Sequence, residues 1–561
     1  MTTLASRLAP PFRRIGSAPA LLAILAAFLM LFSMLPLVVI FWKSLQSTDG
    51  AFVGLSNYRN YFADGSAYHI ITNTLTIAVV SSALTIVLAY LFALCLTHTC
   101  VRFKPVFRGA ALLPLLTPTL LSAMALTQLF GTQGYLHGLM MGQSIYGPIG
   151  IIISMVVSRF PHVFILISTA IALSDSRLYE AAKSLKAGPV KTFLTITLPS
   201  TRYGVLSSAI VCFTLCVTDF AIPKVIGGQY AMLATEIYKQ VVGQMNFQMG
   251  AVVSIIMLAP TLIAFLVDRH ARKRQQASLT AKSIPYTPRP NAWRDGLALA
   301  YCVVITVAMA AMIAIPAYAS FIKFWPYNLS FTLRNYHFGQ FDGAGWQSYF
   351  NSLRLAIAVA TVGTVLTFAG AWLVEKSTAP RWMRDTYQSM TLLPLAVPGL
   401  VLGLATLLYL SEPRNPFGFL YGTMSILVIT TIIHYYTVSH FTATTSLRQL
   451  DPEFELISDS MKASRLKVLL SVTLPLCIPA LLDIWIYLFL SAMNTVSAAI
   501  FLYSTDTIVA SVAVVNMDDA GSYAPAAAMA TTMVATCIAL RILHIVASSA
   551  ISRKTQKWRA T

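Results

Sequence analysis

Charged residues are scarce in this chain: they make up 11% of its 561 residues, against about a quarter of an average soluble domain. Hydrophobic residues reach 57% and the mean hydropathy is +0.70, which is more apolar material than a soluble fold could bury. These values exclude a disordered chain, a collagen and a disulfide scaffold. At roughly 20 apolar residues per crossing, the chain has room for about twelve transmembrane helices.

The motifs of several function classes are also missing. The seven cysteines form no CxxC pair and most lie in apolar stretches, which favours packing roles over a metal or redox site. There is no GxxxxGK[ST] phosphate loop and no HExxH motif. We therefore expect no catalytic residue, no cofactor and no metal, and we expect any ATP hydrolysis to take place on another polypeptide.

Apolar stretches are distributed along the chain as six and six, which predicts an all-α membrane protein of two six-helix halves. The halves cover residues 1–268 and 294–561, and a basic, proline-containing linker at 269–293 joins them. The stretches are 19–42, 73–97, 108–131, 147–171, 203–222, 248–268, 294–320, 351–375, 387–410, 422–446, 477–502 and 522–549.

Lys and Arg outnumber Asp and Glu by 39 to 20, giving a net charge of +19. If the N-terminus is cytoplasmic, the inward segments carry 29 of these cations, the outward loops seven and the spans three. This asymmetry predicts that both termini are cytoplasmic. It also explains the positive charge without a nucleic-acid partner, although contact of the linker with lipid headgroups remains an alternative.

The two halves repeat one another at an offset of 276 to 280 residues. Because each half has an even number of spans, the copies should be related by a two-fold axis along the membrane normal. The paired prolines predict broken helices that face a water-filled path, or simple packing kinks. The matches are Asn73 with Asn351, Leu112-Leu113-Pro114-Leu115 and Pro118 with Leu392-Leu393-Pro394-Leu395 and Pro398, Asp175 with Asp451, and Thr197-Leu198-Pro199 with Thr473-Leu474-Pro475.

Each half has a long inward loop that contains a short amphipathic helix. Asp175 can cap the first, in which Leu178, Ala181, Ala182 and Leu185 share one face, and Asp451 can cap the second. An apolar face on a short, duplicated helix is suited to dock into a groove on a partner. The alternative is a helix that rests among lipid headgroups.

Several residues of the first loop resemble the EAA loop of bacterial ABC importer permeases: Glu180-Ala181-Ala182, Ala187 and Pro199, with Lys186 where that family usually has Gly. The second copy has Leu456-Ile457-Ser458, Lys462, Ala463 and Pro475, and its acidic residue, Glu455, stands one place earlier. The resemblance implies a fused pair of inner-membrane permeases whose loops couple to two ATPase subunits, with an extracytoplasmic solute-binding protein as a further partner. The differences imply unequal coupling of the two loops.

Two further runs are similar to the 2-aminoethylphosphonate branch of fused permeases: residues 217–228, with 237–240 and 246–250 after them, and residues 494–521. Iron(III) and thiamine permeases are the alternatives within the family. An ion-coupled carrier with twelve spans is the alternative of another class, but residues 97–104 lack the Gly/Asp/Arg-rich motif typical of such carriers.

Ionisable side chains at membrane depth are costly and are therefore candidates for function. Asp219 is the first, beside Phe220, and Asn494 opens the second similar run; we place all three in the substrate pathway. Asp219 could instead be a helix-end aspartate that is hydrogen-bonded locally, and Arg159 an interhelical contact. We expect Asp219→Asn to lower transport while leaving assembly intact.

Overall fold

The computed structural model describes residues 18–63, 65–278, 286–377, 379–451, 453, 457, 460–461 and 463–555. The first half contains α1 (Ala18–Leu29), α2 (Leu35–Ser44), α3 (Ser56–Ala63), α4 (Ser66–His98), α5 (Lys104–Leu112), α6 (Leu120–Phe130), α7 (Pro148–Ala172), α8 (Ser176–Ser184), α9 (Pro189–Thr192), α10 (Leu198–Val217), α11 (Ala221–Ile226), α12 (Leu233–Tyr238) and α13 (Phe247–Ser278).

The second half contains α14 (Ala292–Ser320), an antiparallel hairpin of β1 (Ile322–Phe324) and β2 (Asn328–Phe331), α15 (Trp346–Lys376), α16 (Arg381–Ala396), α17 (Gly399–Leu410), α18 (Met424–Arg448), α20 (Arg465–Val468), α21 (Leu474–Asn494), α22 (Ala510–Asp519) and α23 (Tyr523–Thr555). Single π-turns at Met30–Met34, Phe193–Thr197 and Leu469–Thr473 join helices that continue one another. Short 3₁₀ turns occupy several of the connections.

Ten of the described helices are long and apolar enough to cross a membrane, and two bent pairs bring the number to twelve. The all-α prediction of six and six spans is therefore confirmed. The bent pairs are α5–α6, with a bend of 99°, and α16–α17, with a bend of 110°. Both breaks fall at the repeated prolines: Thr117 and Val397 are extended because each precedes a proline, Pro118 or Pro398.

Several of the predicted boundaries differ from the structure. Span 5 ends at Val217 and span 11 at Asn494, each short of the predicted 222 and 502, because the chain leaves the helix at Thr218 and Thr495. The helix α13 continues to Ser278, so residues 269–278 of the predicted linker are helical. The ends of spans 5 and 11 could not be predicted because apolar residues continue past the end of each helix. The end of α13 could not be predicted because its last residues are basic, as expected of a linker.

The first span of each half packs against the other half. The helix α14 contacts α4, α5 and α6, and α2 contacts α17 while α1 contacts α16. One bond across this exchange joins Tyr301 Oη, the donor, to the carbonyl oxygen of Leu88 at 2.9 Å. The sequence halves at 1–268 and 294–561 are therefore interlocked rather than separate bodies.

The core of the first half forms where α4, α7 and α10 cross. The ring of Phe92 lies 5.5 Å from that of Phe160 and 5.4 Å from that of Phe164, in edge-to-face geometry. Gly204 allows α10 to approach α7, because a Cβ there would lie 2.3 Å from the Cβ of Ala170. Close helix contact of this kind fixes the loops at both ends of the bundle.

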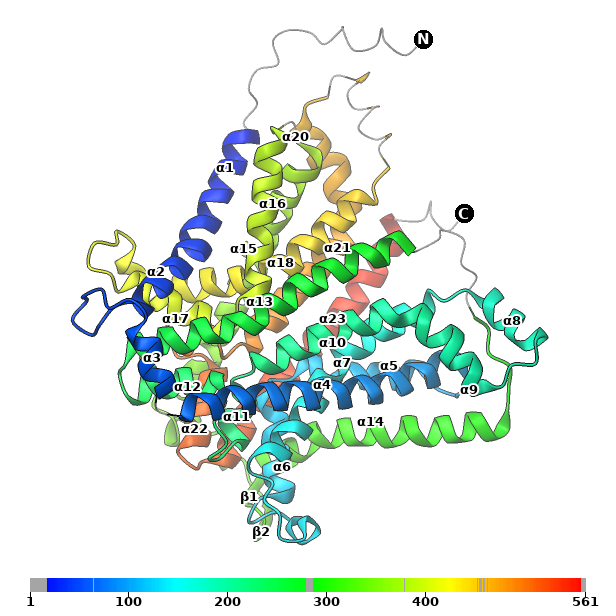
Figure 1. Cartoon of the computed structure of the whole chain (residues 1–561), viewed down its shortest axis with the longest axis horizontal. Coiled ribbons are helices and arrows are strands. Elements are labelled where there is room, and N and C mark those ends of the chain that lie inside the picture. Colours follow the sequence, from blue (N-terminus) through cyan, green and yellow to red (C-terminus); the bar gives the residue numbers. More distant parts are fainter. Residues whose placement is uncertain are drawn as a thin grey trace.

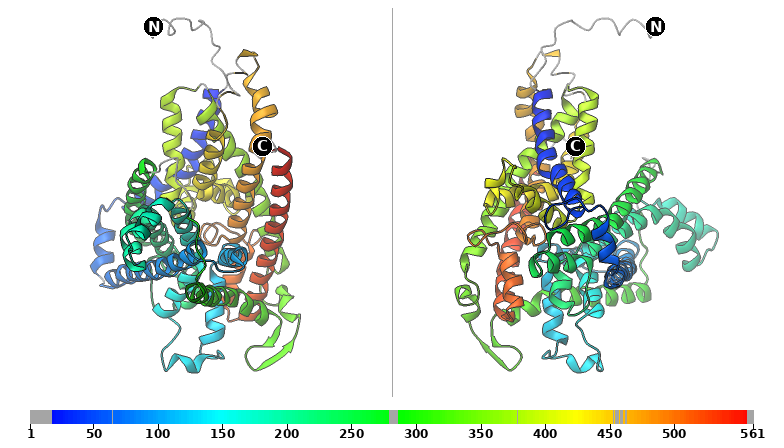
Figure 2. Two further views of the ribbon diagram at one scale, coloured as in Figure 1. Left: turned by 90° about the vertical axis from the view of Figure 1, so that its right-hand side faces the viewer. Right: turned by 60° about the vertical axis from the view of Figure 1, so that its left-hand side comes forward.

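The ends of the two halves that carry the candidate coupling loops lie apart, whereas the opposite ends meet. In Figure 1, α8 of the first half and α20 of the second stand at separate corners of the molecule, and both views in Figure 2 agree. At the other end α11 contacts α22. The chain is thus closed on the side predicted to be extracytoplasmic and spread on the side predicted to be cytoplasmic.

Candidate functional site

The first candidate coupling loop is built around α8. The Asp175 carboxylate accepts a hydrogen bond from the backbone N–H of Arg177 at 3.0 Å, as expected for an N-cap. On the inner face, Tyr179 is buried and its hydroxyl donates to Oγ1 of Thr197 at 3.2 Å. This bond ties the helix to the chain just before α10.

The residues of the EAA resemblance that lie in α8 are divided between its two faces. Glu180 and Ala181 are exposed, whereas Ala182 is buried on the inner face beside Tyr179. Leu178 is 49% exposed and Leu185 is 82% exposed. The predicted apolar face is therefore divided: Leu178, Ala181 and Leu185 point away from the protein, and only Ala182 packs inward. Uncovered apolar side chains beside a carboxylate form a surface that a partner can cover.

Lys186 ends α8 in an unusual conformation. Its φ is +53°, in the left-handed region, and the next backbone N–H, that of Ala187, donates to the carbonyl oxygen of Ala182 at 2.9 Å. This arrangement closes the helix as a left-handed C-terminal cap does. The conformation gives the physical reason for glycine at this position in the resembling family, since glycine adopts it without a Cβ clash.

The second loop is described only in part. The Asp451 carboxylate accepts from the backbone N–H of Glu453 at 3.0 Å, and Ile457 and Met461 are exposed. Ala463 is half-buried. Of the other predicted residues, Leu456, Lys462, Phe454, Glu455 and Ser458 lie outside the described residues.

A π-turn ends at the threonine of each copy of the Thr-Leu-Pro motif, at Phe193–Thr197 and at Leu469–Thr473. Pro199 and Pro475 then stand near the start of α10 and α21, inside the continuous helices that the π-turns join, so each removes one backbone N–H from its helix. Pro199 is exposed and Pro475 is half-buried. The motif therefore marks the point at which each loop enters its span.

The candidate pathway residues gather beyond the end of α10. Asp219 is buried, it forms an ion pair with Arg159 of α7, and its Oδ1 accepts from the backbone N–H of Ile222 at 3.0 Å. The neighbouring Phe220 is buried, with its ring 5.1 Å from that of Tyr238. The sequence alone does not indicate that Arg159 and Asp219 are partners, because they are 60 residues apart. The packing of α7 against α10 brings them together.

The second half has uncharged residues at the matching positions. An offset of 276 places Tyr435 at the position of Arg159 and Thr495 at that of Asp219. Tyr435 lies near both Thr495 and Arg159. Asn494, at the end of α21, is half-buried and its Oδ1 has no hydrogen-bond partner within the described part of the chain. The matching positions of the two halves therefore differ in charge.

Two ion pairs join the halves at the closed end, and the sequence did not reveal either. Lys43 Nζ lies 3.1 Å from the carboxylate of Glu412, and Lys224 Nζ lies 3.0 Å from that of Asp519. The signal was present in the charge pattern, because Lys43 and Lys224 are two of the few cations predicted on the outward side. These two lysines are exceptions to the accumulation of Lys and Arg on the inward side, and each links the first half to the second.

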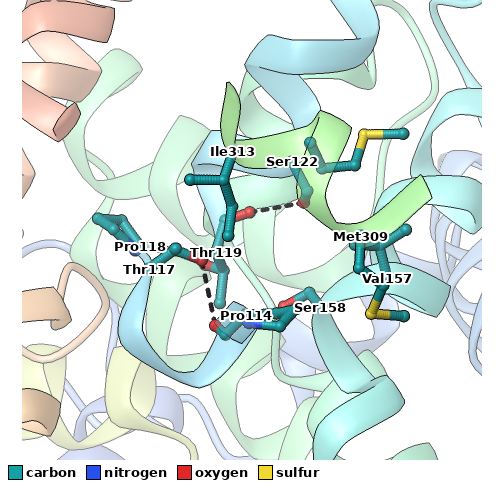
Figure 3. A pocket seen from close by; sticks show the side chains of 10 residues that line it. Pro114, Thr117, Pro118, Thr119, Ser122, Val157, Ser158, Met309 and Ile313 are labelled. Carbon is teal, nitrogen blue, oxygen red and sulfur yellow. Dashed lines mark hydrogen bonds between the residues drawn. The ribbon is translucent and has the colours of Figure 1, made fainter. Parts of the chain in front are cut away.

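A pocket lined by hydroxyls lies at the break between α5 and α6 (Figure 3). Its walls include Thr117, Thr119, Ser122 and Ser158 from the first half and Met309 from α14. The free space is about that of one water molecule. A site of this size can hydrate the broken helix but cannot hold a solute.

Two segments of the chain match one family model, described as the binding-protein-dependent transport system inner membrane component. They cover residues 86–276 and 367–553, more than half of the chain. Each segment runs through one half and includes its loop between the fourth and fifth spans. The predicted duplication is confirmed by these two copies.

Two relatives match this chain across both of its halves. The ferric transport system permease protein of Actinobacillus pleuropneumoniae is 27% identical over 537 residues, covering 92% of this chain and 77% of the relative. A Haemophilus influenzae protein also named as a ferric transport system permease is 27% identical over 490 residues, covering 83% and 76%.

A shorter relative corresponds to one half. The spermidine/putrescine transport system permease protein of Escherichia coli is 25% identical over 245 residues, covering 41% of this chain but 89% of the relative. The match covers most of that relative but less than half of this chain, which contains two copies of the family segment. It belongs to the family of binding-protein-dependent transport system inner membrane components, as a permease with two fused copies.

Proposed function

We propose that the chain is the membrane-spanning subunit of an ATP-driven importer and that its two loops receive two ATPase subunits. The observation that carries the proposal is the outer face of α8, where Leu178 and Leu185 are exposed beside Glu180 on a helix anchored by Tyr179. A soluble partner that covers these side chains could move the helix as a unit. The second loop offers Ile457 and Met461 in a similar way.

The energy for import must come from outside the chain, because the sequence has no phosphate loop for ATP. Closure of the ATPase pair would draw the two loops together. In Figure 1, α8 and α20 lie apart, which supports this mechanism because the two loops have room to move toward each other. We place both termini and both loops in the cytoplasm on the inward bias of Lys and Arg.

Opening toward the other side would require the links at the closed end to separate. Lys43–Glu412 and Lys224–Asp519 are exposed enough for water to replace the partner of each ion, which keeps the cost of separation low. A solute-binding protein that docks at this end could then deliver its solute between the halves. Such alternating access needs only weak contacts between permease and solute.

For the solute we propose 2-aminoethylphosphonate. The runs at 217–228 and 494–521 resemble that branch, and the pathway residues offer one charge of each sign. An aminophosphonate is a zwitterion, so its phosphonate group matches the Arg159 guanidinium and its ammonium group matches the Asp219 carboxylate. The pair would have to open as the halves separate for either charge to meet the solute.

Iron(III) is the second candidate, since both of the full-length relatives described above are named for ferric transport. A ferric ion prefers oxygen ligands, which Asp219 and Tyr435 could supply. Arg159 would oppose a trivalent cation at the same place. The charge of the pathway therefore favours the zwitterion, whereas the relatives favour the metal ion.

The test is uptake into proteoliposomes that contain the chain with its ATPase and binding protein. ATP-dependent accumulation of 2-aminoethylphosphonate, in preference to ferric ion and thiamine, is the expected result. Preference for ferric ion would replace the solute but keep the importer. Uptake that ignores ATP and follows a proton gradient would contradict the importer itself.

A further inference from the structure

Three aromatic rings connect the linker to the first coupling loop. Tyr286, just before α14, stacks on His98 at the end of α4, with ring centroids 4.6 Å apart and an interplanar angle of 21°. Its ring also lies 4.9 Å from that of Tyr179 in α8, and His98 lies 5.3 Å from Tyr179. One linker side chain thus packs on the helix that the proposed function assigns to ATPase docking.

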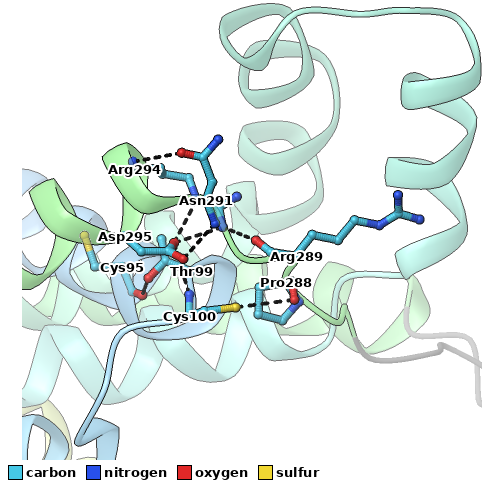
Figure 4. A network of polar contacts seen from close by, with 8 residues as sticks. All are labelled: Cys95, Thr99, Cys100, Pro288, Arg289, Asn291, Arg294 and Asp295. Carbon is cyan, nitrogen blue, oxygen red and sulfur yellow. Dashed lines mark hydrogen bonds and ion pairs between the residues drawn. The ribbon is translucent and has the colours of Figure 1, made fainter.

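The residues that follow Tyr286 are fixed in place by polar contacts (Figure 4). The carboxylate of Asp295, in the first turn of α14, accepts from the backbone N–H groups of Cys100 at 3.2 Å and Asn291 at 3.0 Å. Cys100 Sγ in turn donates to the carbonyl oxygen of Pro288 at 3.5 Å. These bonds hold the start of α14 against the end of α4, so Tyr286 is attached to a rigid base.

The second half has no matching set of rings. The position of His98 is occupied by Lys376 at an offset of 278, and that of Tyr179 by Glu455 at an offset of 276. The fused chain also has only one linker between its halves. The contact between linker and loop is therefore a feature of the first half alone.

We propose that Tyr286 and His98 are positioning residues that clamp α8 to the base of α14. Because α14 packs on the first half but begins the second, movement of α8 would pass directly into both halves. This inference rests on the proposed function for the role of α8, but the clamp itself is a property of the fold. The clamp gives the first loop a stiffer connection to the pore than the second loop has.

Hydrogen exchange of the full-length protein in detergent tests the clamp without any solute or ATPase. Tyr286→Ala should speed exchange in residues 176–187 about three- to ten-fold, the scale set by losing aromatic contacts. Tyr286→Phe keeps the ring and should match the wild type, as should Thr287→Ala at an exposed neighbour. Unchanged exchange in Tyr286→Ala would overturn the clamp.

The effect on coupling is measured as solute moved per ATP hydrolysed in proteoliposomes, a ratio that does not depend on how much protein folds. Tyr286→Ala should lower this ratio several-fold, and Tyr286→Phe should restore it. A normal ratio together with fast exchange in α8 would refute the positioning role. If the wild-type chain itself shows no ATP-driven uptake, the proposed function fails instead, and the exchange result still decides the clamp.

Discussion

Asn351 makes in the second half the contacts that Asn73 makes in the first. Asn73 Nδ2 donates to the carbonyl oxygen of Ala231 at 3.2 Å, and Asn351 Nδ2 donates to that of Ile508 at 3.0 Å. The next residue in each copy, Thr74 or Ser352, accepts a backbone N–H from the same partner segment. The asparagine that repeats in the sequence thus marks a repeated attachment of the second span at the closed end of the molecule.

The two asparagines should differ in their contribution to stability. Asn351 also donates to the carbonyl oxygen of Asp506 at 2.9 Å and is 2% exposed, whereas Asn73 is half-buried with one such bond. Removing a buried partner costs roughly 1–3 kcal/mol. Asn351→Ala should therefore lower the melting temperature of the solubilised protein more than Asn73→Ala. Equal losses would show that the extra bond contributes nothing.

Lys186→Gly should stabilise α8. Its φ of +53° is a conformation that costs a side-chain residue about 1 kcal/mol and costs glycine little. Hydrogen exchange in residues 176–187 should slow about five-fold, the factor that corresponds to that energy. The matched control is Lys183→Gly within the same helix, which should speed exchange by a similar factor. Slower exchange in both variants would contradict the conformational reason.

The outer face of α8 can be tested without disturbing the fold. Leu185 is 82% exposed, so Leu185→Glu should leave the melting temperature unchanged while weakening binding of the ATPase about ten-fold or more. Co-purification and titration of the ATPase against the detergent-solubilised chain measure the effect. Leu139→Glu, at a residue 67% exposed at the opposite end, is the control and should bind normally. Normal binding by Leu185→Glu would remove α8 from the interface.

The sequence was enough to predict the spans and the repeat, but the repeat in the structure includes more residues than the sequence matches showed. Asn57 donates to the carbonyl oxygens of Ser44 and Gln46, and Asn335 repeats this with Ser320 and Ile322. The offset changes from 276 at Ser44 to 278 at Asn57, because the second copy has two more residues in the loop that contains its hairpin. A search at one fixed offset misses such a match.

Two features of the site could not be predicted from the sequence, for physical reasons. The packing of the first span of each half against the other half could not be predicted, because apolar residues that face lipid and apolar residues that face another helix have the same composition. The pairing of Arg159 with Asp219 depends on how α7 and α10 are turned toward each other. Sequence alone could mark both residues as costly at membrane depth but not as partners.

That pairing changes the expectation for Asp219→Asn. The variant leaves the buried Arg159 guanidinium without its carboxylate, and breaking a buried pair costs roughly 3–5 kcal/mol. We now expect both Asp219→Asn and Arg159→Met to lower the melting temperature and the yield of folded protein. The double variant should recover most of the melting temperature, since no buried charge is left alone. Failure to recover would show that the two residues act independently.

The same double variant separates stability from transport. If the pair meets the solute, the double variant should fold and hydrolyse ATP with its partners but take up 2-aminoethylphosphonate at least ten-fold more slowly. Uptake per folded molecule in proteoliposomes gives the answer. Normal uptake would leave the pair as a structural contact and remove it from the pathway.

The closed end should respond to pH through Asp518, next to the Lys224–Asp519 link. Burial, followed by the charge of Asp519, raises the pKa of Asp518 from 3.8 to about 7, against the opposing effect of Lys224. Between these two pH values the unfolded chain binds fewer protons at this carboxyl than the folded one, so stability falls as pH rises from about 4 to about 7 and is then constant. We expect the melting temperature of the solubilised protein to fall between pH 5 and pH 8 by more in the wild type than in Asp518→Asn, which cannot titrate. An Asp518→Asn profile parallel to that of the wild type would place the titrating group elsewhere.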